Sequence, residues 1–314
     1  MKQITYLEII KQAAKITWQN KFLWVFGFLI LLGSLFSNVS WSANSESKEA
    51  KVISDFIQKN PNIFLIILIG VLFLMLIFFI LKIAGTVALV KSANNIAVYK
   101  QTSIRNILSE TKKYISPLVL LEITICLSLL VVIFVLAIPV IYLYAVKAWI
   151  FFAISMIFAI VIFISLIITA YFLRCYAYFF IILSDVKFML ALEMGYSLFK
   201  KNLKESLLMG CISLAVNTLS ASFLLIFIII AALIFLVPIA IAYFLFAEAG
   251  VIVAAIIGGI FILGFMAFIF SPYFVFIQTM WLLFFKEITL EKKEEKNAFE
   301  KTEAVEKIPD PETV

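Results

Sequence analysis

Residues 63–81 read IFLIILIGVLFLMLIFFIL, a stretch without a single charged, amide or hydroxyl side chain. A bilayer core is crossed by about 20 consecutive apolar residues in a helix, so this stretch predicts a transmembrane span. Similar runs recur along the chain. We predict six spans, with approximate bounds 22–39, 63–81, 118–144, 148–173, 207–237 and 251–285.

The composition leads to the same fold class. Of the 314 residues, 65% are hydrophobic and 14% are charged, whereas a soluble domain is nearer half apolar and a quarter charged. We therefore predict an all-α polytopic membrane protein. Residues 1–286 form its membrane domain, and the charged tail at 287–314 is expected to be a frayed helix that runs into disorder.

The distribution of basic residues predicts the orientation. Of the 25 Lys and Arg residues, all but four fall in the N-terminal segment, the second and fourth connectors and the C-terminal tail. The four on the other side are Lys48, Lys51, Lys59 and Lys147. Because cytoplasmic loops carry the excess of basic residues, both termini are expected in the cytoplasm, in a bacterial inner membrane.

The sequence lacks the side chains that several functions require. The chain has no histidine, which excludes Ser–His and Cys–His nucleophile pairs and His-ligated metals. Its three cysteines show no metal-binding or redox spacing. The lysines flank apolar runs and form no nucleic-acid patch. We therefore expect no enzyme, no cofactor and no nucleic-acid partner.

Three connectors have the periodicity of basic amphipathic helices. They are residues 3–20, residues 186–204 with Ser184 or Asp185 as N-cap, and the segment after Thr102 and Ser103. Such helices can lie on anionic lipid at the cytoplasmic interface, or they can pack on the bundle as extensions of the spans. Periodicity does not distinguish a lipid face from a protein face, so both alternatives stay open.

The amphipathic segments also suggest a repeat of three units, each with one such helix and two spans. The sequences at 19–22, 112–115 and 200–203 stand where each amphipathic helix enters a span. Pro139 and Pro238 lie near the outer ends of the first spans of units two and three. All three units would begin in the cytoplasm, which does not favour an inverted-repeat transporter.

Three stretches resemble a known family. They are Thr17–Trp24 (TWQNKFLW), Gly85–Asn106 with Lys91 and Asn95, and Ser184–Asn202 with its terminal Lys-Lys-Asn. Together they resemble bacterial six-span proteins related to the membrane domain found fused to glycerophosphodiester phosphodiesterases. The resemblance covers the chain to about residue 286. It implies a membrane scaffold without hydrolytic activity, since the chain has no room for the catalytic barrel.

Glu122 is the one carboxylate well inside a predicted span. An ionisable residue at that depth is a functional candidate. The alternative is a structural ion pair with Arg174, at the cytoplasmic end of the next span, and we favour the ion pair because no second acidic residue is placed to form a relay.

The last two spans carry small and hydroxyl residues at helical spacing. On the fifth span these are Ser206, Gly210, Ser213, Asn217 and Ser220, and on the sixth they are Gly250, Ala254 and Gly258. Small residues let helices approach closely, so we expect Gly210, Ser213 and Asn217 to pack against the 250–258 face. A polar path for a solute, lined by Asn217, is the alternative.

These features favour a non-catalytic integral membrane protein that organises lipids or scaffolds partners. Its expected partners are membrane lipids, anionic at the cytoplasmic face, and a protein partner or a second copy. The alternative is a transporter or permease subunit for a small solute or lipid. A water-filled cavity lined by Glu122 and Asn217 would favour that alternative.

Overall fold

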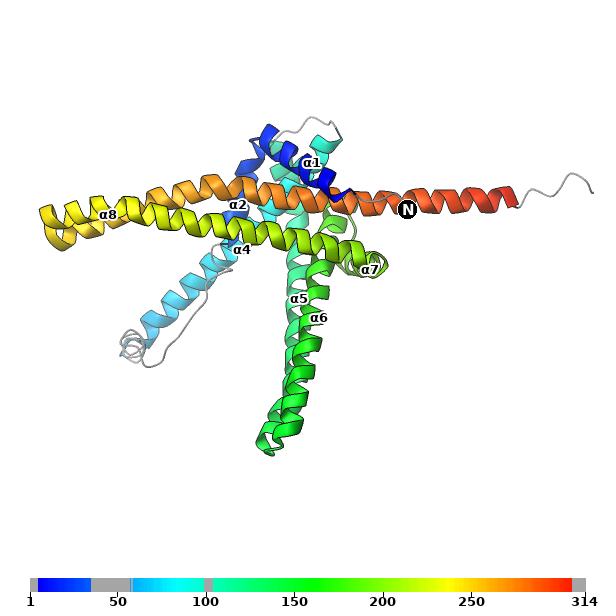
Figure 1. The fold of residues 1–314 in the computed structure, drawn as a ribbon, viewed down its shortest axis with the longest axis horizontal. Coiled ribbons are helices and arrows are strands. Elements are labelled where there is room, and N and C mark those ends of the chain that lie inside the picture. The colour runs from blue at the N-terminus through cyan, green and yellow to red at the C-terminus, as the bar shows by residue number, and fades with distance from the viewer. Residues whose placement is uncertain (1–4, 35–56, 58, 99–103, 307–314) are drawn as a thin grey trace, which may run out of the picture. The chain divides into compact units, whose positions relative to one another are not determined.

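The computed structural model describes residues 5–34, 57, 59–98 and 104–306 (Figure 1). Every element that it describes is an α-helix. The helices are α1 (Tyr6–Gln19), α2 (Leu23–Ser34), α4 (Pro61–Ala97), α5 (Ile104–Ala145), α6 (Trp149–Ser184), α7 (Phe188–Lys201) and α8 (Leu203–Glu306).

Within the described residues, five segments are long and apolar enough to cross a membrane. They are Pro61–Ala97, Asn106–Ala145, Trp149–Ser184, Leu203–Phe244 and Ile252–Thr289. A sixth is reached if α1 and α2, which meet at a bend of 101°, count as one broken span. The first predicted span begins as α2, and its last residues, 35–39, lie outside the described part of the chain. The predicted all-α, multi-pass membrane fold is confirmed.

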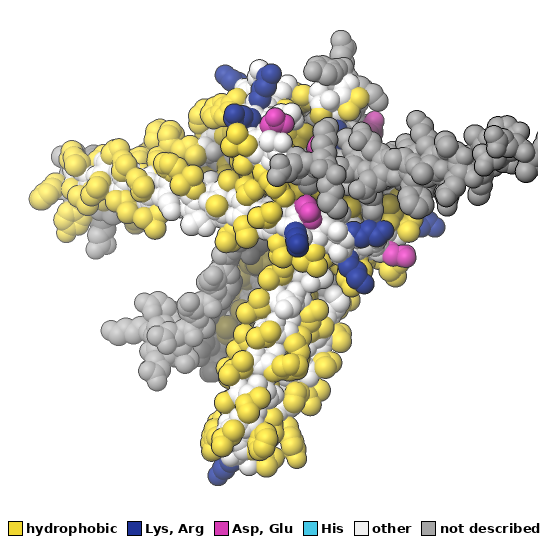
Figure 2. All heavy atoms as spheres, turned by 45° about the vertical axis from the view of Figure 1, so that its right-hand side comes forward, with side chains coloured by type: hydrophobic (Ala, Val, Ile, Leu, Met, Phe, Trp, Pro, Cys, Tyr) yellow, Lys and Arg dark blue, Asp and Glu magenta, His cyan; other side chains and the backbone are white. Residues whose placement is uncertain are grey.

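Apolar side chains cover the outside of these helices. Ile66 on α4 and Ile150 on α6 are 69% and 75% exposed. Figure 2 shows hydrophobic side chains over the visible face of the α5–α6 hairpin. Water would make such a surface unfavourable at about 25 cal/mol per Å², whereas lipid tails solvate it. The exposed surface is therefore that of a membrane protein.

The helices form two compact units. The first contains Met1–Ile16, Ser116–Leu219 and Ile277–Val314, and the second contains Thr17–Ile115 and Ser220–Phe276. Both α5 and α8 contribute residues to each unit. The sequence predicts one membrane domain, and its helices pack in these two units.

In the second unit, α2 packs closely on α4. A side chain added at Gly33 would collide with the backbone of α4, 2.5 Å from the carbonyl oxygen of Phe78. One added at Gly85 would lie 3.0 Å from the carbonyl oxygen of Phe26. These two glycines allow the backbones of α2 and α4 to approach, as small residues do between membrane helices.

The long helix α8 folds back on itself and supplies both predicted last spans. In the second unit, the ring of Phe227 stacks on that of Phe265 at 4.7 Å, and Phe235 lies 5.8 Å from Phe261. Pairs that converge toward a common midpoint define an antiparallel hairpin. Its first arm is Leu203–Phe244 and its second is Ile252–Thr289.

Two of the three predicted segments form separate helices, α1 and α7, whereas the third is an extension of the next span, which is one of the two alternatives left open by the sequence. Residues after Ser103 belong to α5, which continues through Pro117 to Ala145. The predicted cap of α7 is wrong. Lys187 precedes α7, whereas Asp185 ends α6 in the left-handed conformation at φ 54°, a position that Asp tolerates because its short polar side chain bonds locally.

The charged tail continues the last helix. Helix α8 extends to Glu306, past Glu287, where the sequence predicts a frayed helix that runs into disorder. Glu, Lys and Ala dominate that stretch, and they are strong helix formers, so local propensity extends the helix beyond the apolar arm.

The proposed repeat has a counterpart in the chain breaks. The helix is interrupted between α1 and α2 and again between α7 and α8, at the two equivalent sequences 19–22 and 200–203. The side-chain nitrogen Nδ2 of Asn202 donates to the carbonyl oxygen of Leu198 at 3.0 Å, and the backbone nitrogen of Asn202 donates to the same oxygen at 3.1 Å, at the end of α7. The middle unit has no break at 112–115, since α5 is continuous there.

Candidate functional site: an ion pair within the α5–α6 hairpin

Three polar side chains meet between α5 and α6 in the first unit. Nη2 of Arg174 lies 2.7 Å from Oε1 of Glu122. The hydroxyl of Tyr178 donates to the same oxygen at 2.5 Å. The guanidinium of Arg174 also lies 5.8 Å from the centre of the Tyr178 ring. We call these three residues the Glu122 network.

The hairpin itself brings the network together. The chain reverses at Lys147, whose φ of 57° is left-handed, and Ala148 then precedes α6. Because this connection is short, α5 and α6 are antiparallel neighbours. Glu122 and Arg174 lie at similar distances along the two helices from this turn. Tyr178 follows Arg174 by one helical turn and shares its face.

The network stabilises a charge that apolar surroundings would otherwise disfavour. The side chain of Glu122 is 14% exposed and that of Arg174 is 41% exposed. On insertion scales, the free-energy cost of placing a lone charge at mid-bilayer is about 2.5–3.5 kcal/mol. One cationic donor and one hydroxyl donor on Glu122 offset part of this. The expected ion pair is present, and the arrangement is that of a polar link between two helices.

Tyr178 is the member that the sequence prediction missed. Its signal was its place four residues after Arg174, with a hydroxyl able to donate to the same carboxylate. Asn217, the third polar candidate, instead lies on an exposed face of the first arm of α8. The two cavities described below, both in the second unit, are lined by neither Glu122 nor Asn217.

The small-residue positions pack on helices, but not on the predicted partners. Gly210 meets the ring of Phe172 on α6, where an added Cβ would lie 2.8 Å from Cζ. Gly258 meets the ring of Phe235, at 2.9 Å from Cδ1. The indole nitrogen of Trp281 donates to Oγ of Ser213 at 3.3 Å.

The predicted pairing of Gly210 and Ser213 with the 250–258 face is therefore wrong. In an antiparallel hairpin, the start of the first arm lies beside the end of the second, so Ser213 meets Trp281. The turn end of the hairpin is where Gly258 finds its neighbour, and there Gly250 is buried and Ala254 is half-buried. Ser220 is half-buried as well.

A buried aromatic cluster holds α6, α7 and α8 together in the first unit. The Phe172 ring stacks on Phe199 of α7 at 5.0 Å and lies 6.0 Å from Trp281 of α8. Beside them, the hydroxyls of Tyr176 and Ser206 are 2.7 Å apart. Ser206 donates to the carbonyl oxygen of Asn202, so Tyr176 is the donor to Ser206.

The fold and these contacts define a multi-pass, all-α membrane protein whose polar side chains link helices. Comparisons with protein-family models, with curated proteins and with solved structures found no match to this chain.

Proposed function

We propose that this protein is a non-catalytic membrane scaffold that gathers anionic phospholipid at the cytoplasmic face of a bacterial inner membrane. Its termini lie in the cytoplasm, as the distribution of Lys and Arg favours. The resemblance to membrane domains of the phosphodiesterase-fused family supports the same role. The observation that carries the proposal is the division of the α1 surface.

One stripe of α1 is buried in protein. Ile9 is 7% exposed, and Ala13 and Thr17 are fully or nearly fully buried. Tyr6, on the same side, stacks on the ring of Phe284 at 6.3 Å. Packing alone therefore explains this stripe.

A second apolar stripe of α1 is exposed, and the contact of the Trp18 ring with that of Trp24 at 5.6 Å leaves most of the stripe uncovered. Leu7 and Trp18 are 61% and 62% exposed and lie on one face, with Ala14 between them. The exposed Lys11 and Lys15 border that face. A helix with separate protein, apolar and basic sectors has the surface of an interfacial helix, and Trp prefers the headgroup layer.

Helix α7 repeats this division. Its buried side, which includes Ala191, Gly195 and Leu198, faces protein, and Gly195 packs on the backbone of α6 at Leu173. Met189 and Tyr196 are exposed. Exposed lysines lie at both ends of α7: Lys187 directly before it, and Lys200 and Lys201 in its last turn.

Native mass spectrometry of the protein released from nanodiscs would test the proposal. The nanodiscs would contain equal amounts of phosphatidylglycerol and phosphatidylcholine. Each lysine near an anionic surface is worth about 1 kcal/mol. Lys11→Gln with Lys15→Gln should therefore strongly reduce the excess of phosphatidylglycerol retained.

The matched control is Lys59→Gln with Lys147→Gln, which removes the same charge from the opposite side of the predicted topology. It should leave the phosphatidylglycerol excess unchanged. An unmodified protein that retains the two lipids equally would overturn the proposal, and so would equal losses in the two double variants.

A permease or transporter subunit is the second candidate, favoured by the Glu122 network, because charges within a span often mark a solute or ion pathway. The flux of a small solute or lipid, measured in proteoliposomes, decides between a transporter and a scaffold. A transporter would show flux that Glu122→Gln abolishes in a protein that still folds, whereas a scaffold would show none.

A further inference from the structure

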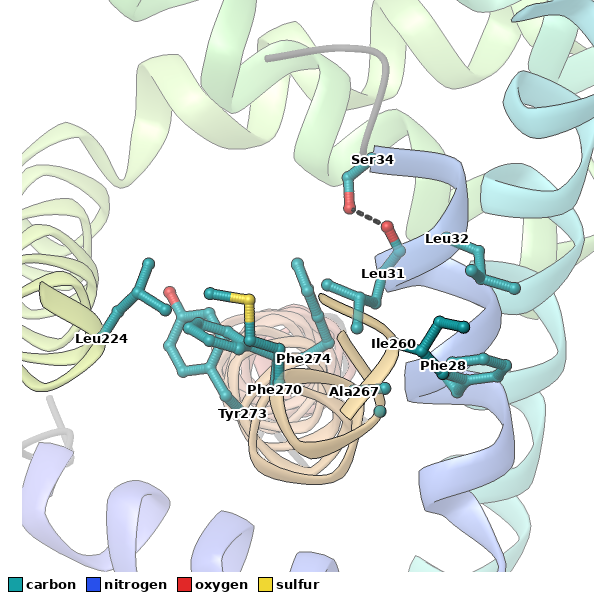
Figure 3. Close-up of a pocket in the computed structure, with 12 residues that line it drawn as sticks. Phe28, Leu31, Leu32, Ser34, Leu224, Ile260, Ala267, Phe270, Tyr273 and Phe274 are labelled. Carbon is teal, nitrogen blue, oxygen red and sulfur yellow. Dashed lines mark hydrogen bonds between the residues drawn. The ribbon is translucent and has the colours of Figure 1, made fainter. Parts of the chain in front are cut away.

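The second unit contains a cavity of about 600 Å³ between α2 and the two arms of α8. Figure 3 shows Phe28 and Leu31 from α2, Leu224 from the first arm, and Phe270 and Tyr273 from the second arm around it. Its volume is in the range of ligand pockets, roughly 300–1,000 Å³.

The packing of α2 explains why this space stays open. Gly33 and Gly85 hold α2 tightly against α4. Gly27 holds α2 against the second arm of α8, where an added Cβ would collide with the backbone carbonyl of Ser271. Because α2 meets backbone atoms on both sides, those of α4 at Gly33 and Gly85 and those of α8 at Gly27, it cannot shift toward α8 to close the space beyond Gly27.

Small residues on the second arm keep the other wall open. Gly264 and Ala267 line the cavity, and a Cβ added at Gly264 would meet nothing within 4 Å. The cavity therefore exists because the glycine contacts of α2 set the positions of the helices. Gly264 has no side chain that could fill it.

The lining selects for an apolar occupant. Among the described residues, no charged side chain lines the cavity, and the hydroxyl groups of the lining belong to Ser34 and Tyr273. The Ser34 hydroxyl already donates to the carbonyl oxygen of Ile30 at 2.8 Å. It also lies 2.9 Å from the carbonyl oxygen of Leu31, the contact drawn in Figure 3. A polar or ionic solute would lose hydration here without replacement hydrogen bonds.

We propose that this cavity binds one acyl chain of a bilayer lipid. Its walls come from segments with the length and apolarity of membrane spans, so hydrocarbon is the solvent at hand. The apolar lining, rich in Leu and Phe side chains, suits a flexible acyl chain, whose methylene groups gain contacts there. The second cavity, of about 420 Å³ between the arms of α8, has an entirely apolar lining at Phe227 and Phe235.

This inference does not rest on the proposed function, because it makes no use of the lipid headgroup or of the lysines of α1. The experiment uses phosphatidylcholine with a diazirine in the middle of one acyl chain. The full-length protein takes up this lipid in nanodiscs, is transferred to lipid-free detergent and is then illuminated. Mass spectrometry maps the adducts.

Lipid on exposed faces exchanges with detergent before illumination, whereas a chain in the cavity is retained. Adducts should therefore concentrate at residues 264–274 and at 28–34, and they should be rare at the exposed Ile157 of α6. Phosphatidylglycerol with the same acyl chain should label these positions equally, which separates this result from the anionic selectivity of the proposed function.

Gly264→Phe fills the cavity and should reduce labelling there about tenfold, equivalent to about 1.4 kcal/mol of lost binding. Gly259→Phe is the matched control, since a Cβ at Gly259 also meets nothing within 4 Å and Gly259 lines neither cavity. The Gly259→Phe variant should be labelled at the cavity residues to the same extent as the unmodified protein.

Uniform labelling of cavity and exposed faces in the unmodified protein would overturn the inference, as would equal labelling of the two glycine variants. The competing occupant is the chain segment 35–56, which follows Ser34 in the sequence. If that segment fills the cavity, the unmodified protein will show no adducts at residues 264–274. The map from the unmodified protein is decisive even if Gly264→Phe does not fold.

Discussion

The Tyr178 hydroxyl donates to Oε1 of Glu122, the same oxygen that Arg174 contacts. One carboxylate oxygen of α5 therefore receives two donors from α6, spaced one helical turn apart. This concentrates the polar link of the α5–α6 hairpin on a single atom, and it makes the charges of Glu122 and Arg174 dependent on each other.

Removal of Arg174 alone should be more harmful than removal of both charges. Arg174→Gln leaves Glu122 unpaired, and we expect a loss of about 1–3 kcal/mol, less than the 3–5 typical of a buried pair because Arg174 is 41% exposed. Thermal unfolding in detergent measures it, in a double-mutant cycle with Glu122→Gln. Strict additivity would show that the pair contributes no coupling energy.

The hydroxyl of Tyr176 should contribute measurably to stability. Tyr176→Phe removes its hydrogen bond to Ser206, which joins α6 to the start of α8, and should destabilise the fold by about 0.5–1.5 kcal/mol. Tyr196→Phe is the control, since Tyr196 is exposed on α7. Equal melting temperatures for the two variants would contradict the role assigned to Tyr176.

The turn end of the α8 hairpin should be sensitive to side-chain size. Gly258→Leu overpacks against the Phe235 ring, which we expect to destabilise the protein by about 1–3 kcal/mol. Gly259→Leu, one residue further along, enters open space and should have little effect. The order of the two melting temperatures in detergent is the readout, and the reverse order would place Gly258 on a lipid-facing surface.

The orientation can be tested by cysteine labelling. In a protein with Cys126, Cys175 and Cys211 changed to Ala, Lys59→Cys should react with an impermeant maleimide added to intact cells. Glu287→Cys should react only after the membrane is opened, because the excess of Lys and Arg places that end in the cytoplasm. Reaction of residue 287 from outside would reverse the topology.

Much of the fold was predictable because it depends on local properties. The spans follow from apolar run length, and α1 and α7 follow from helical periodicity. The Glu122–Arg174 pair was predictable too, since a short turn leaves α5 and α6 only one arrangement. Amphipathic periodicity did not decide whether the segment after Ser103 is a separate helix or an extension of the next span, because it does not reveal where a helix stops; α5 shows that it is an extension.

The sequence by itself determined that this chain crosses a membrane several times, because the partition of each segment depends on its own side chains. Only the tertiary structure decided which faces meet. Gly210 lies against Phe172 and Gly258 against Phe235 because the hairpin register, a property of both arms together, sets their neighbours. The cavity beside Gly264 likewise follows from backbone contacts at Gly27, Gly33 and Gly85, which no single segment encodes.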